Sequence, residues 1–341
     1  MRADPARCSI HQARTRGDAA DVPDDAPHIP SEPEALAARV AAGERRAIAH
    51  AITVLETLSP AAPALIAALE PRLGHAAVVG FTGPPGAGKS TLVNAVVTAL
   101  RASGRRVGVI AVDPSSPVSG GAILGDRIRM TAALDDDGVF VRSLASRGHL
   151  GGLSPAAVRI IDALDAARFD VILIETVGTG QSEIDVAEIA DVRVVLSAPG
   201  LGDDIQAMKS GLLEIADILV VNKGDRPDAE RTLQQLAGAL SIRAGGTGNR
   251  PLLKTTATTG EGVAALLAAI DRLAETARTC DTRTRRRRRA RYLIARAAAD
   301  LITRRIRDGG GDSAGAVDRL ADQVLAGSLA AEDAARSLIS R

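Results

Sequence analysis

A glycine-rich segment that ends in lysine and serine carries the strongest chemical signal in the chain. Residues 83–90 read GPPGAGKS, which matches the phosphate-binding pattern GxxxxGK[ST]. Glycines let successive backbone N–H groups turn toward one anion at the start of a helix. Lys89 is then placed to reach the β- and γ-phosphates of a nucleotide, and the Ser90 hydroxyl to ligate Mg²⁺. The predicted phosphate contacts are Gly83, Pro84, Pro85, Gly86, Ala87, Gly88, Lys89, Ser90 and Thr91.

A second motif concerns the base of that nucleotide. The apolar run Ile218–Val221 leads into residues 222–225, which read NKGD. A carboxylate at Asp225 can accept two hydrogen bonds from guanine, from N1–H and the 2-amino group, whereas adenine offers neither, so ATP would leave this acceptor unpaired. Another expected strand, Leu252–Ala257, ends where a backbone N–H would meet the guanine carbonyl. The sequence therefore predicts GTP rather than ATP, with base contacts at Asn222, Lys223 and Asp225.

Three acidic residues compete for the magnesium and γ-phosphate roles. Asp113 and Glu175 end expected strands, and Asp126 lies in the segment GDRIR. A carboxylate at the carboxyl edge of a parallel sheet lies where a phosphate-bound metal binds, and Gly178 could turn its N–H toward the γ-phosphate. Asp113 could instead form an Asx turn before proline, and Asp126 could pair with a neighbouring arginine. The residues leave open which carboxylate contacts the metal directly, and they name no catalytic base.

Short apolar runs that alternate with helical stretches must position these residues. Most of the runs are unbroken, which is typical of strands buried on both faces of a parallel sheet. The first two bracket a helix that starts at Lys89, giving a right-handed βαβ unit. The pattern predicts a doubly wound, mostly parallel α/β sheet. The expected strands include Ala76–Phe81, Val107–Val112, Val139–Val141, Val171–Ile174, Val192–Leu196 and Ile218–Val221.

The remaining segments differ in character. Residues 1–32 are polar and aperiodic, which predicts a disordered tail, and residues 33–70 carry a helical pattern that predicts an extension packed before the main domain. We place the nucleotide domain at 71–276 and a helical C-terminal arm at 277–341. Within the arm, Arg285–Arg289 is an unbroken basic run, which we interpret as a solvated face before a helix from Tyr292 to Arg307.

Composition excludes several other classes of protein. Lys plus Arg (42) balances Asp plus Glu (41), and there are only three Phe, one Tyr and no Trp, so neither charge nor aromatic stacking favours nucleic acid. No apolar run approaches the length of a membrane span, and the N-terminus lacks the apolar region of a secretory signal. The two cysteines form no metal-binding pattern. We expect a cytoplasmic protein that contacts no membrane.

Taken together, the motifs resemble a known family. The segments GPPGAGKST, DPSSPVSGGAILGDRIRM, SRGHLGGLS, ETVGTGQSE, PGLGDDIQAMKSG and NKGD are similar to those of the MeaB/ArgK-type P-loop GTPases, which include the MMAA-like proteins. The resemblance runs from about residue 34 to 276. It implies a GTPase with a G-domain, a helical N-terminal extension and a dimerisation arm. The implied role is that of a chaperone for an adenosylcobalamin-dependent acyl-CoA mutase such as methylmalonyl-CoA mutase, either gating cofactor loading or protecting the mutase.

The resemblance also assigns residues. It implies that Asp113, Asp126 and Glu175 lie at metal and phosphate positions, and that Lys89, Glu175, Asp126 and Lys209 serve hydrolysis. Residues 200–211, which include Lys209, would form a switch loop that faces the partner. The implied base-contact loop is Thr256, Ala257 and Thr258, although the family more often has serine at position 256.

Two other functions remain as alternatives. The chain could be an ATPase or kinase associated with transport of lysine, arginine and ornithine, which the NKGD segment disfavours because it selects guanine. It could also be a GTP-dependent binding module that does not hydrolyse its ligand. His149, in the loop SRGHLGGL, has no partner in the sequence and is interpreted as a solvated loop residue.

Overall fold

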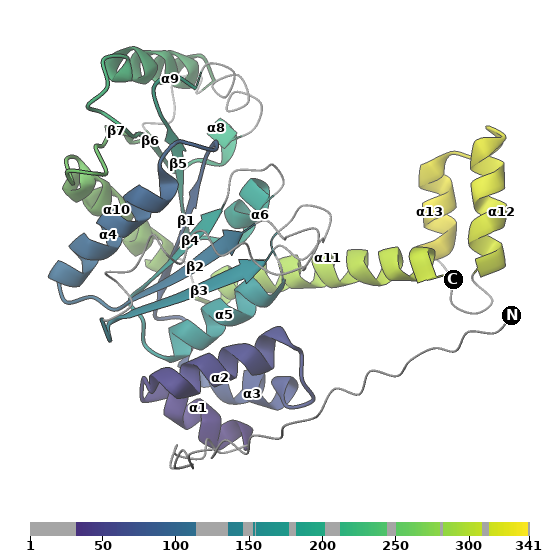
Figure 1. The fold of residues 1–341 in the computed structure, drawn as a ribbon. Coiled ribbons are helices and arrows are strands. Elements are labelled where there is room, and N and C mark those ends of the chain that lie inside the picture. Colours follow the sequence, from purple (N-terminus) through teal and green to yellow (C-terminus); the bar gives the residue numbers. More distant parts are fainter. Residues whose placement is uncertain are drawn as a thin grey trace, which may run out of the picture.

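A seven-stranded, all-parallel sheet forms the centre of the molecule in the computed structural model (Figure 1). The structure describes residues 32–113, 136–145, 153, 155–176, 182–201, 212–243, 250–279, 282–308 and 314–339. The strands run in the order β3-β2-β4-β1-β5-β6-β7. Their bounds are β1 Ala77–Thr82, β2 Val107–Asp113, β3 Val139–Ala145, β4 Val171–Thr176, β5 Val192–Ser197, β6 Ile218–Val221 and β7 Leu252–Lys254. The predicted fold class is confirmed.

Burial on both faces explains why the central strands are mostly apolar. Every residue of β1, β4 and β6 is buried. Side chains alternate between faces along a strand, and accordingly Val78 of β1 belongs to one core cluster whereas Val79 and Phe81 belong to another. The two clusters are the two layers that cover the sheet. The connection from β1 to β2 passes over β4, which pairs with both strands.

Helices cover each face of the sheet. On one face lie α4 (Lys89–Ala102) and α10 (Val263–Thr279), whose apolar residues join the cluster that contains Phe81. On the other face lie α5 (Pro155–Ala166) and α6 (Ser182–Ile189), which share the cluster of Val78. The shorter helix α8 (Leu213–Ile215) and α9 (Ala229–Arg243) pack near β6 and β7. This arrangement fixes the carboxyl ends of the strands at one edge, where the loops after β1, β4 and β6 begin.

Three short helices precede the sheet and pack outside α5. They are α1 (Pro33–Ala41), α2 (Arg45–Glu56) and α3 (Ala62–Leu69), followed by the 3₁₀ turn η1 (Glu70–Arg72). Their buried residues, among them Val40, Ile52 and Leu65, belong to the same cluster as α5 and the sheet. The helical character predicted for 33–70 is confirmed, and its core is continuous with that of the sheet. The tail predicted for residues 1–32 lies outside the described residues except for its last residue.

At the C-terminus, α11 (Thr282–Asp308) is longer than predicted, and α12 (Ala314–Leu325) and α13 (Ala331–Ile339) follow it. The first half of α11 lies against α5 and α6, whereas its second half projects away from the body (Figure 1). No helix in the described part of the chain is long and apolar enough to cross a membrane.

The interpretation of Arg285–Arg289 as a solvated face is wrong for part of the run. Arg285 and Arg289 are 8% and 5% exposed. Both pair with Asp191, whose side chain is 1% exposed, at 3.3 and 2.9 Å, and Arg288 donates to the Ala190 carbonyl at 2.5 Å. Arginine is a good helix former, so α11 begins at Thr282 rather than at Tyr292. The buried carboxylate of Asp191 pairs with three of its guanidinium groups.

Candidate functional site

The phosphate loop connects β1 to α4 with backbone geometry that requires glycine at two positions. Gly83 has a φ of +142°, and a Cβ added there would lie 2.3 Å from the Leu196 carbonyl oxygen of β5. Gly88 has a φ of +86°, and its Cβ would lie 2.5 Å from Asn222 Nδ2. A side chain at Gly83 would therefore clash with the backbone of β5, and one at Gly88 would clash with the amide of Asn222. The loop leads directly into the first turn of α4, as the sequence predicts.

Lys89, the first residue of α4, folds back over this loop. Its side chain is buried, and Nζ donates to the carbonyl oxygens of Gly83 at 2.8 Å and Pro84 at 3.0 Å. These bonds hold a positive charge beside the loop and at the N-terminus of a helix of 14 residues. A helix N-terminus and a lysine together favour phosphate anions.

A hydroxyl and a carboxylate meet next to the loop. Ser90 Oγ donates to Glu175 Oε1 at 2.5 Å, and Glu175 is 2% exposed near the end of β4. The contact follows from the sheet, because Glu175 pairs with Phe81 of the neighbouring strand β1. Oxygen atoms of this kind are the ligands that Mg²⁺ prefers. Ser90 and Glu175 therefore fit a magnesium site.

The other predicted metal and phosphate residues are placed only in part. Asp113 ends β2, one residue after Val112, which pairs with Thr176 of β4. Its backbone thus lies at the same edge of the sheet as Glu175. Asp126, Gly178 and Lys209 lie outside the described residues, so the structure places none of these three.

Asn222 joins the phosphate loop to the base-contact segment. Its Nδ2 donates to the carbonyl oxygens of Ala87 at 3.0 Å and Gly88 at 3.3 Å. Its Oδ1 accepts hydrogen bonds from Thr255 Oγ1 at 3.1 Å and from the Ala257 N–H at 3.2 Å. The side chain is buried, and both ends of its amide are occupied by protein groups. Asn222 therefore positions the two loops relative to each other.

The rest of the NKGD segment is held in a tight turn. Lys223 has a positive φ of 57°, and the Gly224 N–H donates to the Thr255 carbonyl at 2.9 Å. A Cβ on Gly224 would lie 2.8 Å from Lys254 Cγ, so the turn packs directly on the end of β7. Asp225 follows it, is exposed, and makes no hydrogen bond or ion pair with another residue that the structure describes. Its carboxylate is thus available to donors from outside the chain.

The segment after β7 approaches the same place. Thr256 is buried, and its N–H donates to the Glu261 carbonyl at 2.9 Å. The Ala257 N–H is engaged by Asn222, so the next backbone donor belongs to Thr258, whose side chain is exposed. The sequence singled out Asn222 but missed Thr255, a fully buried threonine whose hydroxyl fixes the asparagine amide. A threonine at the end of an apolar strand was the signal for it.

The structure thus brings the phosphate motif and the base motif together at the carboxyl edge of one sheet. Lys89 and Ser90 follow β1, Glu175 lies next to the last residue of β4, and Asn222 and Asp225 follow β6. Asn222 links the two motifs. Backbone N–H groups, a helix N-terminus and a lysine are the groups that stabilise charge on a transferring phosphoryl group. In the described part of the chain, no group of three or more histidine, cysteine or acidic side chains forms a separate metal cluster.

Comparison with known proteins agrees with this geometry. Residues 48–310 match the family model described as methylmalonyl-CoA mutase-associated GTPase MeaB. A protein of Pyrococcus horikoshii named as a GTPase is 50% identical over 232 residues, which is 67% of this chain and 73% of that protein. The GTPase ArgK of Escherichia coli is 46% identical over 191 residues, 55% of this chain and 58% of its own length.

Two further relatives carry other names. The mitochondrial methylmalonic aciduria type A homolog of Mus musculus is 39% identical over 190 residues, 54% of this chain and 46% of that protein. A crystal structure of an LAO/AO transport system kinase superposes with a TM-score of 0.69 at 27% identity, covering 92% of this chain and 98% of that one. The family model covers well over half of the chain, and its relatives are named as GTPases. The chain is a GTPase and belongs to the MeaB family of methylmalonyl-CoA mutase-associated GTPases.

Proposed function

We propose that this GTPase serves an adenosylcobalamin-dependent acyl-CoA mutase such as methylmalonyl-CoA mutase, gating the loading of its cofactor or protecting it. Recognition of guanine is supported by the position of the NKGD turn. The Asn222 side chain holds this turn against the phosphate loop, and the exposed carboxylate of Asp225 is open to a base. The mutase part is supported by the description of the matching family and by the name of the murine relative.

The residues at the sheet edge have distinct roles in this proposal. Lys89 and the N–H groups of the loop neutralise the β- and γ-phosphates of GTP as negative charge shifts during hydrolysis. Ser90 and Glu175 would hold Mg²⁺, with Asp113 and Asp126 as further candidate ligands; the ion supplies positive charge to the phosphate oxygens when bound. Asp225 accepts from guanine, and Thr256, Ala257 and Thr258 enclose the base, with Gly178 near the γ-phosphate.

The segment 200–211 would couple this site to the partner. It begins shortly after β5, which ends at Ser197, and its first residue, Gly200, has a φ of +85°. We propose that the segment is a switch whose conformation depends on the γ-phosphate and that Lys209 faces the mutase or the nucleotide. A switch couples two ligands only when its states bind both of them differently.

The partner role is tested by measuring GTP hydrolysis with and without methylmalonyl-CoA mutase. We expect the mutase to accelerate hydrolysis by the parent protein. Lys209→Ala should weaken the acceleration while leaving GTP affinity nearly unchanged, because the phosphate loop and Asp225 are intact. An unchanged rate of GTP hydrolysis in the presence of excess mutase would contradict the proposed partnership with the mutase.

A second function, as an ATPase or kinase linked to amino-acid transport, is suggested by the name of the structural relative. The exposed carboxylate of Asp225 argues against ATP as the ligand, because adenine lacks the two hydrogen-bond donors with which guanine can pair with a carboxylate. Competition titration of GTP against ATP separates the two functions. A preference for ATP would favour the transport-linked function.

A further inference from the structure

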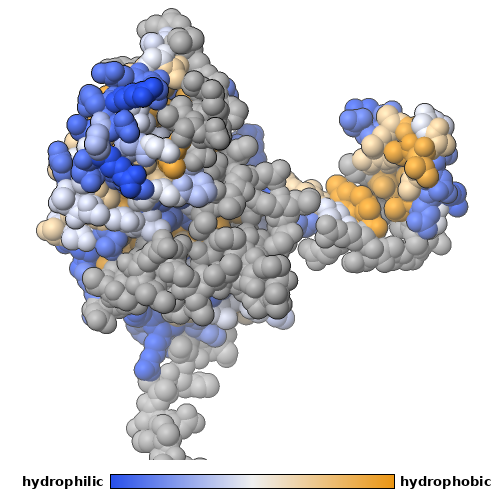
Figure 2. Space-filling model, turned by 45° about the horizontal axis from the view of Figure 1, so that its top comes forward, coloured by the Kyte–Doolittle hydropathy of each residue, from blue (hydrophilic) through white to orange (hydrophobic). Residues whose placement is uncertain are grey.

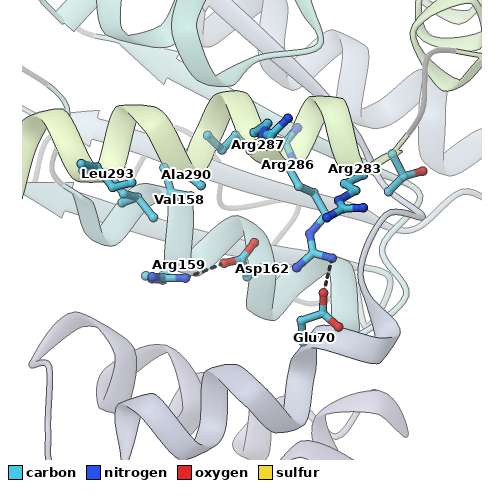
Figure 3. A pocket seen from close by; sticks show the side chains of 12 residues that line it. Glu70, Val158, Arg159, Asp162, Arg283, Arg286, Arg287, Ala290 and Leu293 are labelled. Carbon is cyan, nitrogen blue, oxygen red and sulfur yellow. Dashed lines mark hydrogen bonds and ion pairs between the residues drawn. The ribbon is translucent and has the colours of Figure 1, made fainter.

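A pocket lies between the first half of α11, α5 and η1, away from the nucleotide site (Figure 3). Its volume is about 880 Å³, and none of its lining residues belongs to the phosphate loop or the base-contact segments. Pockets of 300–1,000 Å³ are typical of sites for small molecules. Five of the lining side chains are arginines, namely Arg159, Arg283, Arg286, Arg287 and Arg289.

The basic run of α11 divides between two faces of the helix. Arg285, Arg288 and Arg289 pair with Asp191 and fix the helix to the body, and Arg289 also borders the pocket. Arg283, Arg286 and Arg287 lie three and four residues apart and therefore share another face, which lines the pocket. Pairing with Asp191 explains the first set of arginines, whereas in the second set Arg286 pairs with Glu70 of η1.

The charge of the pocket is not balanced by its own acids. Only two of the lining residues, Glu70 and Asp162, are acidic. Arg286 pairs with Glu70 at 2.7 Å, but Glu70 is 57% exposed, and an exposed pair of this kind contributes little stability. Arg287 is exposed and makes no hydrogen bond or ion pair with another described residue. These guanidinium groups can turn to an added anion at small cost.

Asp162 lies at the side of the pocket formed by α5. It pairs with Arg159 at 3.3 Å. Burial nevertheless raises its pKa to about 6, against the opposing effect of Arg159, Arg289 and Arg286. Desolvation therefore destabilises the charged form of Asp162 more than the neighbouring arginines stabilise it. Its negative charge also opposes an anion in the pocket.

Four apolar side chains gather farther along the pocket, beside the ion pair of Arg159 and Asp162 (Figure 3). They are Val158, Ala290, Leu293 and Ile294, and Ile294 is 68% exposed. In Figure 3, Arg283 and Arg286 lie at the end near Glu70, whereas Leu293 and Val158 lie farther along the same groove. A ligand that fills the pocket must carry its charge at one end and an apolar group at the other.

We propose that this pocket binds a soluble organic diphosphate, with the phosphates on Arg283, Arg286 and Arg287 and the apolar group along Leu293 and Ile294. A guanidinium group pairs with phosphate through two parallel hydrogen bonds, and a diphosphate carries enough charge to engage several of them. A single carboxylate would leave most of the positive charge unpaired.

Calorimetry of the full chain, saturated with GDP and Mg²⁺ so that the phosphate loop is filled, tests the proposal. The probes are geranyl diphosphate and inorganic pyrophosphate. Geranyl diphosphate should bind roughly tenfold or more tightly than pyrophosphate, because its chain covers apolar surface. Arg286→Gln with Arg287→Gln should weaken binding of both probes roughly tenfold or more. Ile294→Ser should weaken only geranyl diphosphate.

Two further variants separate this site from general electrostatic attraction. Arg291→Gln removes one arginine from an exposed position of α11 that does not line the pocket, and it should leave both affinities nearly unchanged. Asp162→Asn should strengthen binding severalfold, because it removes the opposing charge. The proposal would be overturned if Arg291→Gln lowered the affinity for the probes as much as the double variant does. Absence of geranyl diphosphate binding at millimolar concentration would overturn it as well. Capture by phosphatidic acid vesicles without binding of the soluble probe would also overturn it.

Discussion

At the scale of single residues, the nucleotide site depends on one buried amide. Asn222 accepts from Thr255 and Ala257 and donates to Ala87 and Gly88, so the loop for the phosphates and the loop for the base are joined through its side chain. The sequence identified Asn222 as part of a motif. It could not show that the amide is fully engaged by protein, because Thr255 is 33 residues away.

We predict that Asn222→Ala both destabilises the protein and weakens the binding of guanine nucleotides, because the Asn222 side chain joins the two loops. The substitution leaves buried donors and acceptors unpaired, which costs about 1 to 3 kcal/mol in free energy of unfolding. GDP affinity should fall roughly tenfold or more, as both loops lose their fixed spacing. Denaturant unfolding and calorimetry measure the two effects. Asn94→Ala, the same change at a half-buried position of α4, is the control, and equal effects from both variants would refute the role.

At the scale of secondary-structure elements, the strands were predictable and α11 was not. Unbroken apolar runs such as Ile218–Val221 are buried on both faces, so local composition was sufficient. The basic run of α11 is anchored by Asp191, a residue 94 positions earlier in the chain. A run of charged residues predicts an exposed surface only when the fold brings no opposite charge from a distant part of the chain. The spacing of residues within the run does not reveal such a partner.

The contact between α5 and α11 predicts a pH dependence of stability. The pKa of Asp162 is raised from 3.8 to about 6 in the folded protein, so folding takes up a proton between these two pH values. Its contribution to stability is present at acidic pH and is lost as the pH rises through about 6. Asp162→Asn should therefore raise the free energy of unfolding at pH 7.5 by about 2 to 3 kcal/mol.

The difference between Asp162→Asn and the parent should shrink as the pH falls to 4.5. Urea unfolding at several pH values measures it. Asn94→Ala on α4, which removes no titratable group, should show no such trend. A constant difference across this range would contradict the assignment of the titration to Asp162.

At the scale of the whole molecule, the C-terminal arm extends from the body and carries exposed apolar side chains. Leu301 and Ile306 of α11 and Leu325 of α12 are 66%, 41% and 87% exposed, and Figure 2 shows apolar surface gathered on the projecting arm. Such a patch is typical of an interaction surface. We propose that residues 277–341 form a dimerisation arm, separate in function from the GTPase domain at 71–276 and the helical extension at 33–70.

We predict that Leu301→Lys combined with Leu325→Lys converts a homodimer to a monomer while GTP hydrolysis without partner stays nearly unchanged. Light scattering of the eluting protein measures the mass. Leu58→Lys, at a residue 74% exposed in the turn after α2, should leave the dimer intact. A monomeric parent at tens of micromolar concentration would exclude the arm as a stable interface.

The central claim is that the nucleotide state of this GTPase controls its affinity for the mutase. Titration calorimetry of methylmalonyl-CoA mutase against the protein bound to GDP, and against the protein bound to a non-hydrolysable GTP analogue, tests it most directly. We predict affinities that differ by about fivefold or more, the usual lower range of coupling between two sites. In the Asp225→Asn variant, the two guanine nucleotides should no longer produce different affinities for the mutase. The corresponding xanthine nucleotides should restore the difference, because an amide at position 225 pairs with xanthine. Equal affinities for the two nucleotide forms of the parent would contradict the account.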